Sequence, residues 1–325
     1  MNPSPASDID IVYTWVDGND PRLNALRSRY AGTPASGMSD DTGGTTRYAN
    51  LGELAWSVAS VNRFIPWARR IFIVTDGQDP MPLLEPVLRQ FSHPVPVEVV
   101  DHRTIFRGCE ELLPVFNSIS IETMLWRIPG LSDRYIYFND DTFVMAPMQP
   151  SDWFDGERLI LHGHRMPLWW ASLLDRLRMR GGRNVIGFKT AMIAAARQLG
   201  TGHLLYYYHT PTAQSRRLLE EYFAAHPGVA ERNAAPKFRE RTQFTPHSLC
   251  NLLAERAGCL RIEHSDINLF LKPVASRSDY LTVRLAWADR RADLQLGCIS
   301  SLDKASPAQQ KEFEQWISHR LQISL

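Results

Sequence analysis

The chain has 325 residues, of which 44% are hydrophobic and 22% are charged, so it can bury a sizeable core and is too apolar to be disordered as a whole. Its formal net charge of +1 excludes the strongly basic surface of a nucleic-acid-binding protein. No apolar run reaches the roughly 20 residues of a membrane span, and the N-terminus lacks the pattern of a signal peptide. We therefore expect a cytoplasmic protein without a nucleic-acid partner.

Short apolar runs alternate with amphipathic segments over the first 150 residues. Helices are predicted at 51–62 and 119–127 from the spacing of their apolar residues, and a glycine-rich loop is predicted at 31–46. Strands are predicted where β-branched and aromatic residues dominate: 9–15, 70–75, 97–100 and 134–138. Strands that alternate with helices predict an α/β fold with a mostly parallel sheet flanked by helices.

Helices are predicted to dominate after about residue 150, so that the C-terminal half is helix-rich. Their predicted ranges are 187–199, 214–225, 246–257 and 307–321. We divide the chain into an α/β core at 1–150, a variable insertion at 151–205 that would be an acceptor or lid region, and a helical remainder at 206–325. The cysteines lack metal-site spacing and are predicted to be free thiols: Cys109, Cys250, Cys259 and Cys298.

Asn139, Asp140 and Asp141 directly follow the predicted strand at 134–138. Two adjacent carboxylates repel each other unless a cation or hydrogen-bond donors neutralise them. Asp140 and Asp141 are therefore predicted to bind Mg²⁺ (or Mn²⁺) together with diphosphate oxygens, and a solvated turn is the alternative. Asp17 follows the first strand, and because carboxyl ends of parallel strands share one edge of a sheet, one site is expected there.

Three further side chains are candidates for the same site. Glu122 is predicted to be a second metal ligand or a hydrogen-bond acceptor for a donor sugar, or else a surface glutamate paired with Arg127. Asp10 lies inside an apolar run, and because a buried carboxylate needs a partner, it would line a ligand pocket or pair with an arginine. His209 is a candidate general base near neutral pH, although a lone histidine is more often structural.

Two segments of the second half carry cationic groups. Arg216 and Arg239 can meet phosphate oxygens during phosphoryl transfer, with a solvated basic face as the alternative. Residues 164–183 combine two tryptophans and several leucines with arginines. This segment is predicted to border the path of an acceptor; a helix packed on the core and a helix lying on an anionic membrane are the alternatives.

Long runs of the sequence resemble the Stealth family, which contains bacterial capsular polysaccharide hexose-1-phosphate transferases and the α/β subunit of the lysosomal-enzyme N-acetylglucosamine-1-phosphotransferase. The first region resembles IDIVYTWVDGNDP at 9–21. The second resembles TRYANLGELAWSVASVNRFIPWARRIFIVTDGQDP at 46–80, HRTIF at 102–106, and LPVFNSISIETMLWRIPGLSDRYIYFNDDTF at 113–143.

The third region resembles HTPTAQSRRLLEEYFAAHP at 209–227 and KFRERTQF at 237–244, which puts the family's histidine on His209 and its arginines on Arg216 and Arg239. In the fourth region, Ser300 and Ser301 replace polar family residues, and Asp303 is a candidate substitute. These replacements put in doubt any donor contact that a carboxylate or amide makes there in the family.

The resemblance implies a glycosyltransferase A-like fold and a metal-dependent transfer of a sugar 1-phosphate from a UDP-sugar to a hydroxyl of an oligo- or polysaccharide, with release of UMP. It implies a role in capsule or surface polysaccharide synthesis. The segment at 164–183 separately leaves peripheral contact with the inner face of the membrane as an option. The catalytic residues would be His209, Asp141 and Arg239. The implied substrate-binding residues are Asp10, Asp17, Arg47, Glu122, Asn139 and Arg216. An ordinary glycosyltransferase that releases UDP and a non-catalytic nucleotide-sugar-binding protein are the alternatives.

Overall fold

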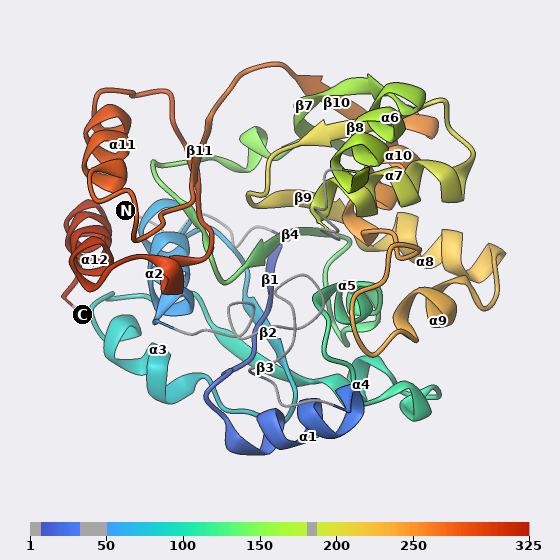
Figure 1. The fold of residues 1–325 in the computed structure, drawn as a ribbon, viewed down its shortest axis with the longest axis horizontal. Helices are drawn as coiled ribbons and strands as arrows, with labels where there is room; N and C mark the ends of the chain where they lie inside the picture. The colour runs from blue at the N-terminus through green and yellow to red at the C-terminus, as the bar shows by residue number, and fades with distance from the viewer. Residues whose placement is uncertain (1–7, 33–50, 181–186, 325) are drawn as a thin grey trace.

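A five-stranded sheet forms the centre of the computed structural model, which describes residues 8–32, 51–180 and 187–324 (Figure 1). The strand order is β3-β2-β1-β4-β9, and every neighbouring pair is parallel except β4 and β9. The strands span Asp10–Thr14 (β1), Ile71–Thr75 (β2), Val97–Asp101 (β3), Arg134–Asn139 (β4) and Thr212–Ser215 (β9). The prediction of an α/β fold with a mostly parallel sheet is confirmed.

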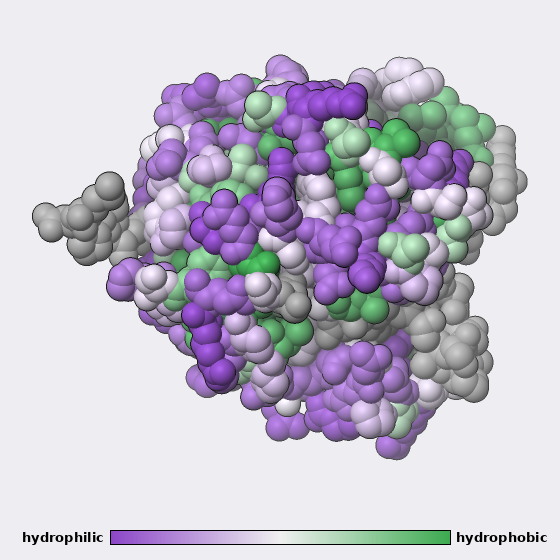
Figure 2. Space-filling view, turned by 90° about the vertical axis from the view of Figure 1, so that its left-hand side faces the viewer, coloured by the Kyte–Doolittle hydropathy of each residue, from purple (hydrophilic) through white to green (hydrophobic). Residues whose placement is uncertain are grey.

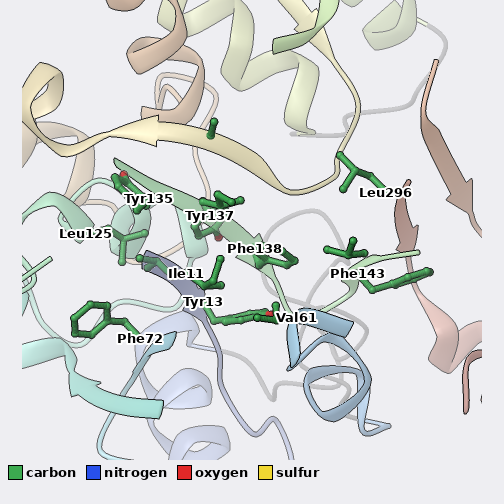
Figure 3. Close-up of a cluster of buried hydrophobic side chains, with 14 of the residues drawn as sticks. Ile11, Tyr13, Val61, Phe72, Leu125, Tyr135, Tyr137, Phe138, Phe143 and Leu296 are labelled. Atoms are coloured by element: carbon green, nitrogen blue, oxygen red, sulfur yellow. The ribbon is translucent and has the colours of Figure 1, made fainter. Parts of the chain in front are cut away.

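The sheet is buried because its central strands are apolar on both faces. Every residue of β1 and β2 is buried, as the continuous apolar runs of parallel strands require. Figure 3 shows the side chains of the core that β1 and β4 share, where the rings of Tyr13 and Phe138 lie 5.1 Å apart. Helices cover the two sides: α2 (Glu53–Phe64) and α12 (Pro307–Leu321) on one, α4 (His102–Ile105) and α5 (Ser118–Glu122) on the other (Figure 1).

Some local elements differ from the prediction. The helix expected at 119–127 consists of α5 and a separate 3-10 turn, Leu125–Arg127. Helix α1 (Pro21–Ala31) was not predicted; Asp20 caps it by accepting a hydrogen bond from the Arg22 N–H at 2.8 Å. The remaining elements of the first half are α3 (Met81–Leu88) and a 3-10 turn, Glu110–Leu112.

Four predicted helices of the second half are present: α7 (Phe188–Leu199), α8 (Arg216–Ala225), α10 (Pro246–Arg256) and α12. The start predicted for α8 was wrong because Gln214 and Ser215 belong to β9, and the Ser215 side chain caps the helix. This half also contains α6 (Leu168–Arg180), α9 (Val229–Ala234) and α11 (Tyr280–Asp289). Among the described residues, no helix is long and apolar enough to cross a membrane.

Strands also occur after residue 150, so the prediction of a helical remainder was incomplete. β6 (Phe154–Asp155), β7 (Arg158–Pro167), β8 (His203–Tyr207) and β10 (Leu260–Glu263) pair with one another. β5 (Thr142–Val144), β11 (Asn268–Leu271) and β12 (Leu296–Ile299) form a three-stranded sheet. The register of this three-stranded sheet puts Cys298 opposite Thr142, next to the end of β4.

Candidate active site

The carboxyl ends of β1 and β4 form the edge where candidate residues meet. In the order β3-β2-β1-β4, the strands that follow β1 in the chain are first added on one side of it, as β2 and β3, and then on its other side, as β4. Ligands of open α/β sheets bind beyond the carboxyl ends of the strands at the point where the strand order reverses in this way. Thr14 is paired with Asn139, so the residues that follow both strands lie at this edge. The structure therefore brings Asp17 to the same edge as Asn139, Asp140 and Asp141.

An acidic cluster lies at this edge. Burial raises the pKa of Asp140, and the charges of Asp141 and Glu53 raise it further. Burial, together with the charges of Asp141 and Asp303, raises the pKa of Glu53 to about 7. Glu53 is the first residue of α2, and one of its oxygens accepts a hydrogen bond from the Leu51 N–H. The cluster holds more negative charge than its described neighbours neutralise, and this is the condition under which a cation binds.

Asp141 is the residue at which the other groups converge. Its Oδ1 is buried and has no hydrogen-bond partner among the described residues, and it lies 3.5 Å from Nε2 of His209. The Cys298 thiol donates to its Oδ2 at 3.6 Å. Side-chain ligand atoms of Asp141, His209 and Cys298 lie within 4.8 Å of one another, which makes the three a candidate metal site.

The donor set of this site fits a hard cation better than a soft one. Burial and the charge of Asp141 raise the pKa of Cys298 well above its usual value, which favours the neutral thiol in the metal-free site. Asp141 and His209 are the other donors of this group, and the carboxylates of Asp140 and Glu53 lie near enough to Asp141 for their charges to interact. Carboxylate oxygens suit Mg²⁺ or Mn²⁺. Oδ1 of Asp141, which faces Nε2 of His209 at 3.5 Å and has no closer partner among the described residues, is the atom that such an ion would bind.

His209 is placed by the direction of β9. Because β9 is antiparallel to β4 and begins at Thr212, His209 lies beside the carboxyl end of β4. The edge of its ring packs against Phe188, with centroids 5.4 Å apart. Burial lowers the pKa of His209, but the nearby carboxylates of Asp141 and Glu122 outweigh burial, and the pKa ends above its usual value. An imidazole beside a carboxylate can accept and hold a proton.

Glu122 is buried in a second polar group behind the edge. Its Oε2 lies 3.4 Å from Nε2 of His247, and its Oε1 accepts a hydrogen bond from the Tyr137 hydroxyl at 3.2 Å. The His247 and Tyr137 rings stack, with centroids 3.9 Å apart. Burial raises the pKa of Glu122, but the adjacent His247 and Arg239 outweigh burial and hold it below its usual value. The expected alternative, a surface pair with Arg127, is absent: the described partners of Arg127 are Cys109 and Arg107.

Three other predicted residues lie near the carboxyl edge. Arg239 donates to the Ser118 hydroxyl at 2.9 Å, and its charge influences both Glu122 and His209. The Asn139 side chain accepts a hydrogen bond from Tyr137 at 3.0 Å. Asp17 forms a turn in which its Oδ1 accepts the Asn19 N–H, and its backbone bonds to the Gln78 side chain. These three stay predicted substrate-binding or catalytic groups.

Two predicted residues lie at the opposite edge of the sheet. Asp10 is at the amino end of β1 and is fully buried, where it accepts hydrogen bonds from Arg69 at 2.8 and 2.5 Å. This contact is the pairing with an arginine that was one of the two alternatives expected for Asp10. Arg216 follows β9 at the amino end of β4 and pairs with Glu220 at 2.5 Å. The structure does not bring Asp10 or Arg216 to the cluster around Asp141, and Arg47 lies outside the described residues.

Glu53, His247 and Cys298 belong to the site but were not predicted as site residues from the sequence. Glu53 could have been noticed as a carboxylate that begins an apolar helix, and His247 as a polar residue within the apolar pattern of α10. Cys298 was interpreted only as a free thiol, which it is, since all four cysteines are free. Asp303 was named as a substitute in the fourth region, and the structure places its charge near Glu53.

Comparison with known proteins identifies the conserved segments. Residues 7–33 match the model of Stealth protein conserved region 1, and residues 47–161 match that of conserved region 2. An exopolysaccharide phosphotransferase of Streptomyces coelicolor is 33% identical over 297 residues, which are 87% of this chain and 46% of that protein. A capsular polysaccharide phosphotransferase of Actinobacillus suis is 39% identical over 148 residues, 46% of this chain and 38% of that protein. The chain thus spans less than half the length of these two relatives.

Solved structures of two sugar transferases resemble the chain over most of its length. A galactosyltransferase in complex with donor and acceptor sugar analogs has a TM-score of 0.43 and 13% identity, over 95% of both chains. Mouse xyloside xylosyltransferase 1 in its apo form has a TM-score of 0.40 and 12% identity, over 89% of this chain and 96% of that one.

Proposed function

We propose that this chain, which belongs to the Stealth proteins, is an enzyme that transfers a sugar 1-phosphate from a UDP-sugar to a hydroxyl of a glycan acceptor. The transferred group is a hexose 1-phosphate or an N-acetylhexosamine 1-phosphate. UMP is released and a phosphodiester is formed, in the synthesis of capsule or other surface polysaccharide. The names of the relatives support this proposal, because they are phosphotransferases of capsular polysaccharide and exopolysaccharide.

In the proposed reaction, an acceptor oxygen attacks the phosphorus that carries the sugar. A new phosphorus–oxygen bond forms, the bond to the bridging oxygen of the diphosphate breaks, and UMP leaves with the electron pair. The hydroxyl proton passes to Nε2 of His209, and Asp141, 3.5 Å away, stabilises the imidazolium that results. Arg239 would meet the charge that develops on the phosphate oxygens.

The acidic cluster is proposed to hold the divalent cation through Asp140 and Asp141, with Glu53 as a further carboxylate. Bound there, Mg²⁺ or Mn²⁺ neutralises diphosphate charge and orients it for in-line displacement. Asp17, Asn139 and Glu122 are proposed to contact the nucleotide sugar. Acceptor contacts within 151–205, the role of Arg47, and a cytoplasmic location stay predictions.

The single observation that carries the proposal is the pairing of His209 with Asp141 near two more carboxylates, Asp140 after β4 and Glu53 at the start of α2. A general base next to a carboxylate cluster is what both the proton transfer and the binding of a diphosphate-bound cation require. A plain glycosyltransferase needs the same cation, so the nucleotide product separates the two functions.

The test is the nucleotide released when the protein is incubated with UDP-N-acetylglucosamine or UDP-glucose, Mg²⁺ and an oligosaccharide acceptor. UMP supports the proposal, and UDP would mean an ordinary glycosyltransferase. Nucleotide binding without turnover would mean a binding protein. Asp141→Ala and excess EDTA should each abolish turnover, whereas Asp155→Ala, an exposed carboxylate on β6, should leave it unchanged. Full activity of Asp141→Ala would remove the cation from the proposal.

A further inference from the structure

Helix α6 exposes a stripe of large apolar side chains, which we call the α6 face: Trp169, Trp170, Leu173 and Leu177. At 100° per residue these four fall within about one third of the helix circumference. Trp169 is 68% exposed and Leu177 is 52% exposed. Within the described part of the chain, none of the four belongs to the hydrophobic core or packs against it. The core-packed alternative therefore does not describe these side chains.

The opposite side of α6 anchors the helix, so the orientation of the α6 face is determined by packing. Ala171 is buried, and α6 packs against α7, β7 and β8. Asp175 accepts hydrogen bonds from Thr190 at 3.1 Å and from Arg241. The α6 face is therefore presented outward by a fixed helix.

The charge that borders the α6 face is positive. Arg176 is exposed about 20° of helical rotation from Trp169, whereas the exposed Arg178 lies about 80° beyond Trp170, on the side of the buried Ala171. Lys189, on α7, lies close enough to Arg178 for the two charges to interact. Asp175 is the acidic residue of α6, and it forms an ion pair with Arg241 on the side of the helix that packs against the rest of the protein. An occupant of the α6 face must therefore be apolar where it meets the stripe and anionic at its border.

We propose that the α6 face docks this protein on the surface of an anionic lipid bilayer. Tryptophan and leucine insert at the boundary between headgroups and acyl chains, and Arg176 at the border of the face meets lipid phosphates. A glycan would stack on the tryptophan rings but would gain little from Leu173 and Leu177, which offer only hydrocarbon. The aliphatic half of the stripe therefore favours lipid over sugar as the occupant.

Docking through α6 would bring the candidate active site close to the bilayer. α6 packs on α7, and Phe188, the first residue of α7, contacts His209. In addition, Asp175 of α6 accepts a hydrogen bond from Arg241, which follows Arg239 by two positions in the chain.

The test is co-sedimentation with vesicles of phosphatidylcholine alone and of phosphatidylcholine mixed with phosphatidylglycerol. The unmodified protein should bind the mixed vesicles, and binding should weaken as salt screens the arginines. A variant with Trp169→Ser, Leu173→Ser and Leu177→Ser should bind roughly tenfold less or weaker still, the loss expected from one large apolar side chain alone. Arg176→Gln should weaken the preference for phosphatidylglycerol.

The matched control is Val283→Ser on α11, where a single apolar side chain is 62% exposed. α11 lies on the left in Figure 1, and the face shown in Figure 2 is mostly hydrophilic, with hydrophobic residues scattered over it. This variant should bind vesicles like the unmodified protein. Melting temperatures should be unchanged for all variants because the substituted side chains are exposed; if the triple variant does not fold, the arginine variant and the salt series still decide.

Three results would overturn the proposal. The first is failure of the unmodified protein to bind phosphatidylglycerol vesicles, or undiminished binding by the triple variant. The second is a higher KM for the glycan acceptor in the triple variant with vesicle binding intact, which would make the α6 face an acceptor site. The third is that the unmodified protein is a dimer in light scattering and binds no vesicles, while the triple variant is a monomer. That result would make the α6 face a contact between copies of the chain. None of these readouts depends on which nucleotide the enzyme releases.

Discussion

Replacing Asp10 with alanine should destabilise the fold without weakening nucleotide binding. The carboxylate is fully buried and accepts hydrogen bonds from Nε and Nη2 of Arg69 and from the Ser132 N–H at 2.8 Å. Asp10→Ala leaves these donors without an acceptor, and removing one partner of a buried ion pair costs about 3–5 kcal/mol. The Arg69 side chain is one third exposed and also donates to the Gly130 carbonyl, so we expect about 3 kcal/mol, the lower end of that range.

Thermal unfolding measures this cost. With an unfolding entropy of about 2.1 cal/mol/K per residue, a chain of 325 residues should lose about 4 °C of Tm for about 3 kcal/mol. Asp8→Ala is the matched control, because Asp8 forms a mostly exposed pair with Arg134 that contributes at most about 1 kcal/mol. The double variant Asp10→Leu with Arg69→Met should recover much of the loss, since both charges are removed together.

A melting temperature of Asp10→Ala within about 1 °C of the unmodified protein, a cost of about 0.7 kcal/mol or less by the same entropy, would contradict this expectation. If the variant is also deficient in UDP binding by calorimetry, Asp10 lines a ligand pocket after all. Loss of stability with unchanged UDP affinity would assign Asp10 to the arginine pair that the structure contains.

Three further predictions concern the site and its support. His209→Ala should lower kcat by roughly 10²–10⁴-fold with little change in UDP affinity, and steady-state kinetics showing intact kcat with weak donor binding would contradict the base. The pKa of Glu53 is raised from 4.5 to about 7, so the stability of the metal-free protein should fall as pH rises through about 7. Melting in EDTA should show this fall, and Mg²⁺ should reverse it near neutral pH. Glu53→Gln should lessen it and leave the part due to Asp140, whose pKa is also raised, and a Tm independent of pH would refute it. Gly297→Ala should cost about 1–3 kcal/mol in denaturant unfolding because its Cβ would lie 2.3 Å from the Phe143 ring, and Phe143→Leu should relieve it; an unchanged midpoint would contradict the packing.

The sequence alone was enough for the four parallel strands of the central sheet and for the residues at their ends, but not for the antiparallel β9. β1, β2 and β4 are buried on both faces, so each is a continuous apolar run whose pattern depends on no distant partner. Asn139–Asp141 follows β4 in the chain itself, so its place at the carboxyl edge could be predicted from parallel topology. The short strands after residue 150 lack such runs; β7, for instance, contains two histidines and a glycine, and it was not predicted.

The composition of the site was decided by pairings between distant segments. Cys298 reaches Asp141 because β12 pairs with β5, and Glu53 reaches it because α2 begins at the same edge. The antiparallel direction of β9 places His209 beside the carboxyl end of β4 and carries Arg216 to the opposite edge, although the two are seven positions apart in the chain. Periodicity could likewise predict an amphipathic segment at α6, but only packing against α7 showed which side of the helix is covered. Sequence patterns predict local conformation and burial. Which of two roles a buried or exposed group has depends on contacts that exist only in the folded chain.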